Sequence, residues 1–119
     1  MDEDIRFPVY ILGATGAVVQ PFVCPYACTV RDLIGVAGLD PGDAETITLT
    51  NTTQSDITLG VLLWGSTLSS YAKGAWTADA TYGDTVCAEG DVLLFTVSTL
   101  EQASLLSLIL ELDPKCRAV

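Results

Sequence analysis

The sequence predicts an all-β fold, an antiparallel two-sheet sandwich of about eight strands with a jelly-roll-like arrangement. Short apolar runs recur along the chain, several of them with apolar residues at every second position, and turn residues separate these runs. Half of the 119 residues are hydrophobic and 17% are charged. This length and composition predict one β-sandwich domain over residues 1–119, with a single buried core.

The first two predicted strands lie near the start of the chain. Residues 7–12 form an apolar run that ends at Gly13, and residues 18–24 form a second run that contains Pro21. A central strand needs the N–H group that proline lacks, so the second run is expected to be an edge strand or a bulged strand. The glycine-containing segment between the runs lacks the ending of a phosphate-binding loop and is interpreted as a hairpin turn.

The middle of the chain carries the clearest strand signals. Residues 28–36 are a third candidate of mixed pattern. Residues 44–52 alternate strictly, with Ile47 and Leu49 on one face and threonines on the other. A polar turn leads to residues 57–64, which alternate again. These two runs are predicted to form an antiparallel hairpin.

The last third of the chain is less regular. Residues 65–83 are rich in small and polar residues and predict at most one weak strand, near residues 75–82. A tight turn at residues 89–91 precedes residues 92–98, which are predicted as a fully buried type of strand. Residues 103–112 fit either a helix or a strand, and a strand is preferred because every other element is one.

The charge and the N-terminal sequence limit the kinds of partner that are expected. The net charge is -10, with 15 acidic and 5 basic residues, so no nucleic-acid partner is expected, and the acidity is interpreted first as an aid to solubility. The apolar runs are too short to span a membrane, so no membrane partner is expected. Acidic residues follow Met1 directly, which is unlike a signal peptide, and synthesis in the cytoplasm is expected.

No catalytic residue, metal site or cofactor is expected. The chain has no histidine, which is the commonest general base and metal ligand. Its four cysteines, at positions 24, 28, 87 and 116, lack the close pairing of a zinc site and are predicted to be buried free thiols. Acidic pairs such as Glu89 and Asp91 flank turn residues, and turn chemistry explains them. The chain is therefore predicted not to be an enzyme.

Three segments together resemble a known group of proteins. They are residues 21–30 (PFVCPYACTV), the threonine-rich residues 45–53, and residues 87–93 (CAEGDVL) before the final strands. Their order over most of the chain is similar to that of the small jelly-roll cement or decoration proteins of tailed bacteriophage heads. The resemblance implies a structural protein, made in the host cytoplasm, that binds the major capsid protein on the outer surface of the virion. It also implies a symmetric oligomer that reinforces the shell. The low share of charged residues and the positive mean hydropathy predict buried subunit contacts, and hence a homodimer or a homotrimer.

Two groups of residues are the candidate contacts with such partners. The first is an N-terminal arm, residues 1–6, in which Asp2, Glu3 and Asp4 would meet a basic surface, together with Arg6 and Phe7. A frayed terminus is the alternative for this arm. The second group belongs to the segment 65–83 and places Trp76 at the centre of a contact, with the accompanying residues Tyr71, Lys73 and Tyr82.

Other interpretations of the aromatic group stay open. Trp76 can instead cap the sandwich core. Alternatively, the aromatic side chains can form a platform for sugars, which would make the chain a carbohydrate-binding module or a fibre or adhesin domain. An accessory subunit of an enzyme is a third class.

Overall fold

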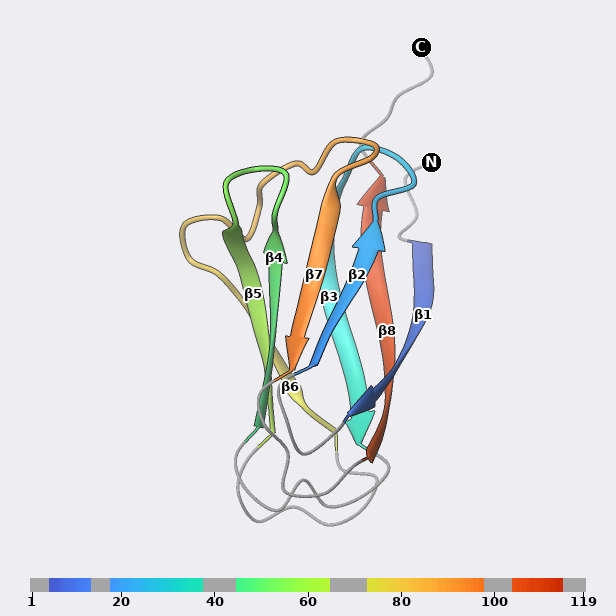
Figure 1. Cartoon of the computed structure of the whole chain (residues 1–119). Helices are drawn as coiled ribbons and strands as arrows, with labels where there is room; N and C mark the ends of the chain where they lie inside the picture. Colours follow the sequence, from blue (N-terminus) through green and yellow to red (C-terminus); the bar gives the residue numbers. More distant parts are fainter. Residues whose placement is uncertain (1–4, 14–17, 38–44, 65–72, 98–103, 115–119) are drawn as a thin grey trace.

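The computed structural model describes residues 5–13, 18–37, 45–64, 73–97 and 104–114. These residues form eight β-strands and no helix, which confirms the predicted all-β class (Figure 1). The strands are β1 (Ile5–Gly13), β2 (Val18–Val23), β3 (Cys28–Ala37), β4 (Glu45–Asn51), β5 (Ile57–Trp64), β6 (Ala75–Ala78), β7 (Val92–Val97) and β8 (Ser104–Pro114). The segment at residues 103–112 is therefore a strand, as preferred from its sequence. Within the described part of the chain, no helix is long and apolar enough to cross a membrane.

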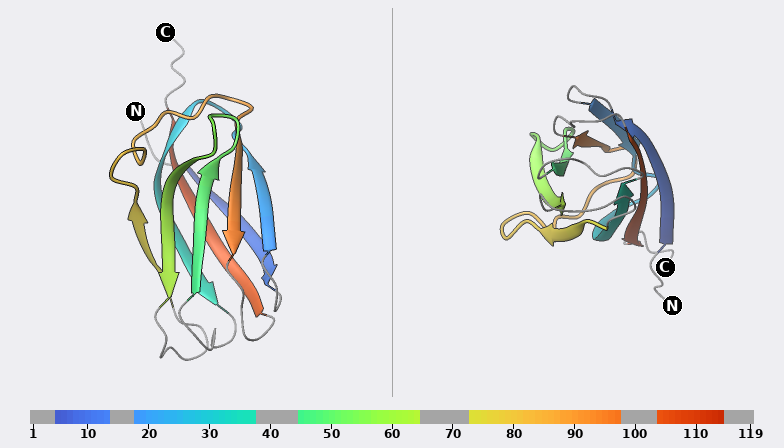
Figure 2. Two further views of the ribbon diagram at one scale, coloured as in Figure 1. Left: turned by 60° about the vertical axis from the view of Figure 1, so that its left-hand side comes forward. Right: turned by 90° about the horizontal axis from the view of Figure 1, so that it is seen from below.

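The strands build two antiparallel sheets that face each other. One sheet has the order β1-β8-β3 and the other β2-β7-β4-β5-β6. The pairs β1–β8, β2–β7 and β4–β5 are nested about the middle of the chain, which is the pattern of a long hairpin rolled into a jelly roll. Seen from below in Figure 2, the two sheets curve around a shared interior.

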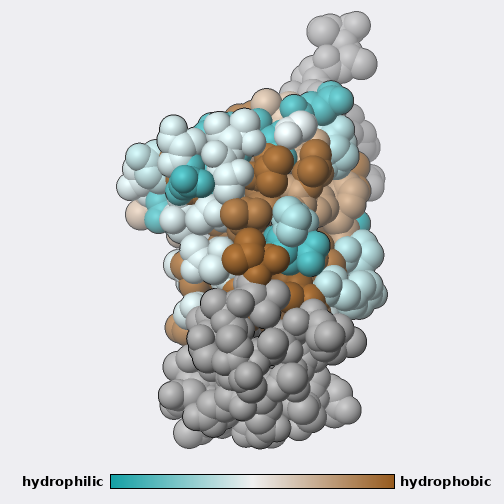
Figure 3. Space-filling model, viewed as in Figure 1, coloured by the Kyte–Doolittle hydropathy of each residue, from teal (hydrophilic) through white to brown (hydrophobic). Residues whose placement is uncertain are grey.

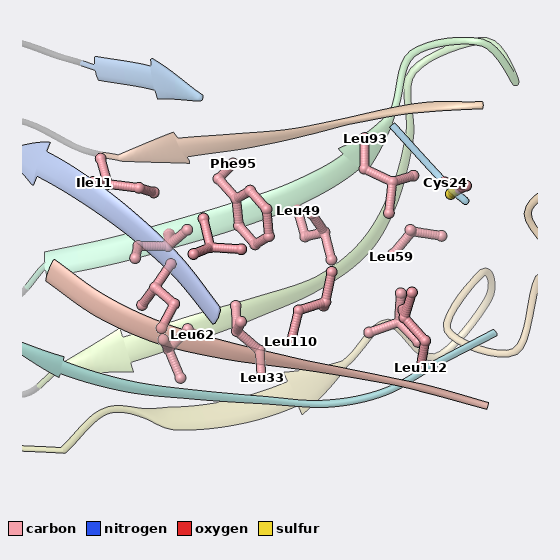
Figure 4. Close-up of a cluster of buried hydrophobic side chains, with 14 of the residues drawn as sticks. Ile11, Cys24, Leu33, Leu49, Leu59, Leu62, Leu93, Phe95, Leu110 and Leu112 are labelled. Carbon is pink, nitrogen blue, oxygen red and sulfur yellow. The ribbon is translucent and has the colours of Figure 1, made fainter. Parts of the chain in front are cut away.

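The core fills the space between the sheets because alternate residues of each strand point inward. Ile47, Leu49 and Phe95 of one sheet and Leu108 and Leu110 of the other are fully buried; Figure 4 shows many of these side chains meeting between the sheets. The prediction that residues 92–98 form a fully buried type of strand is wrong. Burial alternates along β7, because only one of its faces meets the opposite sheet.

Aromatic side chains close the edge between β1 and β2. The ring of Phe7 lies 5.7 Å from that of Phe22 and 6.2 Å from that of Tyr26, measured between ring centroids. β2 is an edge strand, as Pro21 predicted. However, β1 and β2 belong to different sheets, so the predicted hairpin turn between them is wrong: the chain crosses there from one sheet to the other.

β6 closes the opposite edge of the sandwich. It pairs with β5. Lys73, two residues before β6, forms an isolated antiparallel β-bridge with Val36 of β3. The backbone N–H of Gly74 donates to the carbonyl of Gly35 at 3.0 Å. The two sheets are thus joined by backbone hydrogen bonds at this edge, and the weak strand predicted near residues 75–82 exists in shortened form.

Candidate interaction surfaces

A buried polar cluster ties together the ends of three strands. The Oδ2 atom of Asp91 accepts hydrogen bonds from Asn51 Nδ2 (3.0 Å), Gln54 Nε2 (2.8 Å) and the backbone N–H of Ala88 (2.9 Å). The backbone carbonyl of Asp91 also accepts from the N–H of Cys24 at 2.9 Å. The bond from Asn51, followed by the one from Gln54, holds the pKa of the Asp91 carboxyl below its ordinary value. We call Asn51, Gln54 and Asp91 the polar clasp.

Two turns adjoin the polar clasp. Asn51 Oδ1 accepts from the backbone N–H groups of Thr53 and Gln54, which shapes the turn after β4. Gly90 has a φ of 89°, a conformation that favours glycine in the predicted turn at residues 89–91. The clasp therefore fixes one end of the sandwich, and it offers rigidity to any surface that the strands present.

Three buried thiols lie beside this end. Cys24, Cys28 and Cys87 are free and almost wholly buried, as predicted, whereas Cys116 lies outside the described residues. Cys28 and Cys87 exchange backbone hydrogen bonds of 2.9 and 2.7 Å. A hydrogen bond with Cys28, helped by burial, raises the pKa of Cys24 to about 12. A hydrogen bond with Cys24 and burial also raise the pKa of Cys87.

We expect these thiols to be inert in the folded protein. The raised pKa values keep the thiols of Cys24 and Cys87 protonated at pH 8, and the thiolate is the reactive form. Cys28 is shielded from reagents by its complete burial. Titration with a thiol reagent at pH 8 should leave Cys24, Cys28 and Cys87 unmodified in the native protein. In denaturant under non-oxidising conditions it should find all four cysteines of the chain. Rapid native labelling of these three, or fewer than four thiols after denaturation, would contradict the expectation.

Trp76 packs against the core. Its indole lies over Gly60 of the neighbouring strand, where an added Cβ would overlap the ring. Its Nε1 atom is buried and has no hydrogen-bond partner among the described residues. The structure thus places Trp76 where the core alternative put it, and of the aromatic group it leaves Tyr82, 43% exposed, at the surface. The predicted contact role of Trp76 is not tested by this arrangement.

The other predicted contact residues are scattered. Ile5 and Arg6 belong to β1, so the prediction that they are part of an N-terminal arm is wrong. Arg6 is exposed and its Nε lies 3.2 Å from Glu111 Oε2, whereas Phe7 turns inward to the aromatic edge. Lys73 is exposed beside β3. Asp2, Glu3, Asp4 and Tyr71 lie outside the described residues, and no common site forms from the remaining candidates.

The outer side of the five-stranded sheet is a feature that the sequence interpretation missed. Every described side chain that these strands direct outward is uncharged, although the chain as a whole has a net charge of -10. Apolar side chains gather there over β2 and β7 (Figure 3). We call this surface the uncharged face, and it consists of Val19, Pro21, Val23, Thr46, Thr48, Thr50, Thr58, Val61, Leu63, Ala75, Thr77, Val92, Leu94 and Thr96.

The outer side of the three-stranded sheet, which we call the mixed face, combines apolar and charged residues. Ile109 of the central strand β8 lies between Pro8 and Ile34, and Tyr10 beside them is 64% exposed. A second row across the same sheet carries the charged residues Arg6, Glu111 and Asp32. The sequence shows alternating residues in the strands of both faces. It does not show which strands pair, and the pairing is what brings these residues together on one surface.

Comparisons with known proteins give one weak likeness. No family model matches the chain, and no curated protein matches it. Among solved structures, the chain is similar to a virus-like particle of the extra small virus of the giant freshwater prawn Macrobrachium rosenbergii. The TM-score is 0.32 and the identity 10%, over 95% of this chain and 81% of the other. That neighbour is a viral capsid structure, and a superposition at this TM-score does not assign a function.

Proposed function

We propose that this chain is a structural protein of a virus particle that binds the outer surface of the capsid and reinforces it as a symmetric oligomer. The observation that carries the proposal is the pair of exposed, partly apolar faces on opposite sides of one sandwich. Exposed apolar patches on a folded domain mark surfaces for protein contact. A domain with two such faces can join two neighbours at once, and joining neighbours is what a shell-reinforcing protein must do.

Two further observations support the proposal. The sequence resembles bacteriophage decoration proteins, which implies the tailed phage head as the setting and the major capsid protein as the partner. The net charge of -10 suits a position outside the shell, because packaged nucleic acid would repel an acidic chain. The proposal includes no catalytic activity, cofactor or metal for this chain.

Binding to shells tests the proposal. Recombinant protein is mixed with empty shells assembled from the major capsid protein encoded in the same genome, and the shells are pelleted. We expect the protein to pellet with the shells and to raise their melting temperature. Protein that stays in the supernatant at micromolar concentration would contradict the proposal. Binding on a glycan array without binding to shells would support the carbohydrate-binding alternative instead.

A further inference from the structure

The uncharged face is unusual for a chain with so many acidic residues. The charged side chains Arg6, Asp32 and Glu111 lie on the outer side of the other sheet. On the uncharged face, by contrast, Val19 is 52% exposed, Val23 is 59% exposed and Leu63 is 48% exposed. An exposed apolar surface with this distribution points to a partner, and the distribution of charge indicates which one.

A second copy of this chain fits the uncharged face better than a basic partner does. A basic partner is attracted by acidic side chains, and the described outward side chains of this face include none. Two copies, each with a net charge of -10, repel one another wherever charged surfaces meet. They can approach closely where both surfaces are neutral.

The same consideration selects the symmetry of the contact. In a head-to-tail contact the uncharged face of one copy would meet a different surface of the next copy, and those surfaces carry charge. In a two-fold contact the same face meets itself, so neutral surface is buried against neutral surface. We propose that two copies form a two-fold dimer in which the uncharged faces pack sheet against sheet. The proposal deepens the function proposed above, on whose protein-contact role it rests, and it leaves the mixed face for the shell.

The edge of this sheet is suited to face-to-face contact rather than to strand addition. The edge strands of this sheet are β2 and the four-residue β6. A short edge strand offers little backbone to an added strand, and Pro21 within β2 has no N–H to offer. The side chain of Gln20 donates to the carbonyl of Pro21 at 3.2 Å and so occupies an acceptor there. A partner therefore buries more surface by covering the uncharged face than by adding a strand to the sheet.

Sedimentation velocity of the purified protein, without shells, tests the dimer. The disrupting variant is Val19→Glu/Leu63→Glu, which adds two charges at half-exposed positions of the uncharged face. The matched control is Tyr10→Glu/Ile109→Glu, which adds the same charges to the mixed face. We expect the wild type and the control to dimerise, and the disrupting variant to dimerise more than about a hundredfold more weakly, with an unchanged circular dichroism spectrum.

The dependence of dimerisation on salt concentration is a second test. Dimerisation of two negative chains should strengthen between about 50 mM and about 500 mM NaCl, because salt screens their repulsion. A strictly monomeric wild type, equal dimerisation of both variants, or dissociation of the control alone would overturn the proposal. A monomer whose shell binding is lost in Val19→Glu/Leu63→Glu would assign this face to the shell and overturn the dimer, while sparing the shell-binding part of the proposed function. A dimer that does not bind shells would overturn the proposed shell binding and keep the dimer.

Discussion

Replacing Asp91 by alanine is expected to lower the free energy of unfolding by about 3 kcal/mol or more. The substitution removes the acceptor of three hydrogen bonds, from Asn51, Gln54 and the backbone of Ala88. Asn51 is fully buried, so its amide cannot turn to water without opening the turn after β4. Urea unfolding followed by circular dichroism measures the loss.

Two companion variants make this result specific to the polar clasp. Asp84→Ala removes an exposed carboxylate in the preceding loop and should change stability by less than about 0.5 kcal/mol. Asp91→Asn keeps the shape but removes the charge, and should fall between the alanine variant and the wild type. An Asp91→Ala protein as stable as the Asp84→Ala protein would show that the clasp does not hold this end of the sandwich.

The lowered pKa of Asp91 gives the same clasp a pH dependence. Because the folded protein holds this carboxylate more strongly in its charged form than the unfolded chain does, its contribution to stability is present above the unfolded pKa of about 3.9. It is lost as the pH falls through the lower folded value. The stability difference between wild type and Asp91→Asn should therefore shrink as unfolding is measured from pH 7 towards pH 2. A difference that stays constant over this range would contradict the assigned hydrogen bonds.

Replacing Trp76 by alanine is expected to cost about 3 kcal/mol of stability, since the indole packs against the core over Gly60. The loss should appear in the melting of the dissociated protein. Trp76→Phe should cost less, because it keeps an aromatic ring against the core and loses only part of the indole, and because the Nε1–H that is lost has no partner among the described residues. A Trp76→Ala protein with unchanged melting would place the side chain in a contact surface instead, as one interpretation of the sequence proposed.

Gly60 supplies the matched test of this packing. A Cβ at residue 60 would overlap the Trp76 ring and would lie 2.8 Å from the carbonyl oxygen of Thr77. Gly60→Ala should therefore be destabilising by itself. The double variant Gly60→Ala/Trp76→Ala should lose less stability than the sum of the two single losses, because it lacks the ring that the new methyl group would displace. Strict additivity would show that the two positions do not interact.

The strands were predictable because their signals are local. The alternation around Ile47 and Leu49 placed β4 in its hairpin with β5, and Pro21 placed β2 at an edge. The errors arose where pairing is long-range. The segment between β1 and β2 has the composition of a hairpin turn, yet β1 pairs with β8 and β2 with β7, across almost the whole chain. Burial on one side only, as for β7, likewise depends on which sheet lies opposite.

The candidate surface was less accessible from the sequence than the fold. Trp76 stands in an irregular, aromatic segment that is typical of a binding loop. Only the pairing of β6 with β5, which lays the ring over Gly60, shows that it packs on the core. The uncharged face draws residues from five strands, between Val19 and Thr96. Its clearest signal in the sequence is that the outward positions of β4 are threonines rather than charged residues. The rest of the surface follows from the strand order.

Hydroxyl-radical footprinting of the wild-type protein tests the central claim most directly. Oxidation of individual side chains is compared between a dilute sample and a concentrated one, and read by mass spectrometry. The two-fold dimer predicts that Val19 and Leu63 become protected on concentration, whereas Tyr10 and Ile109 keep their reactivity. Protection of Tyr10 and Ile109 with Val19 and Leu63 unchanged would contradict it, because the mixed face and not the uncharged face would then join the two copies.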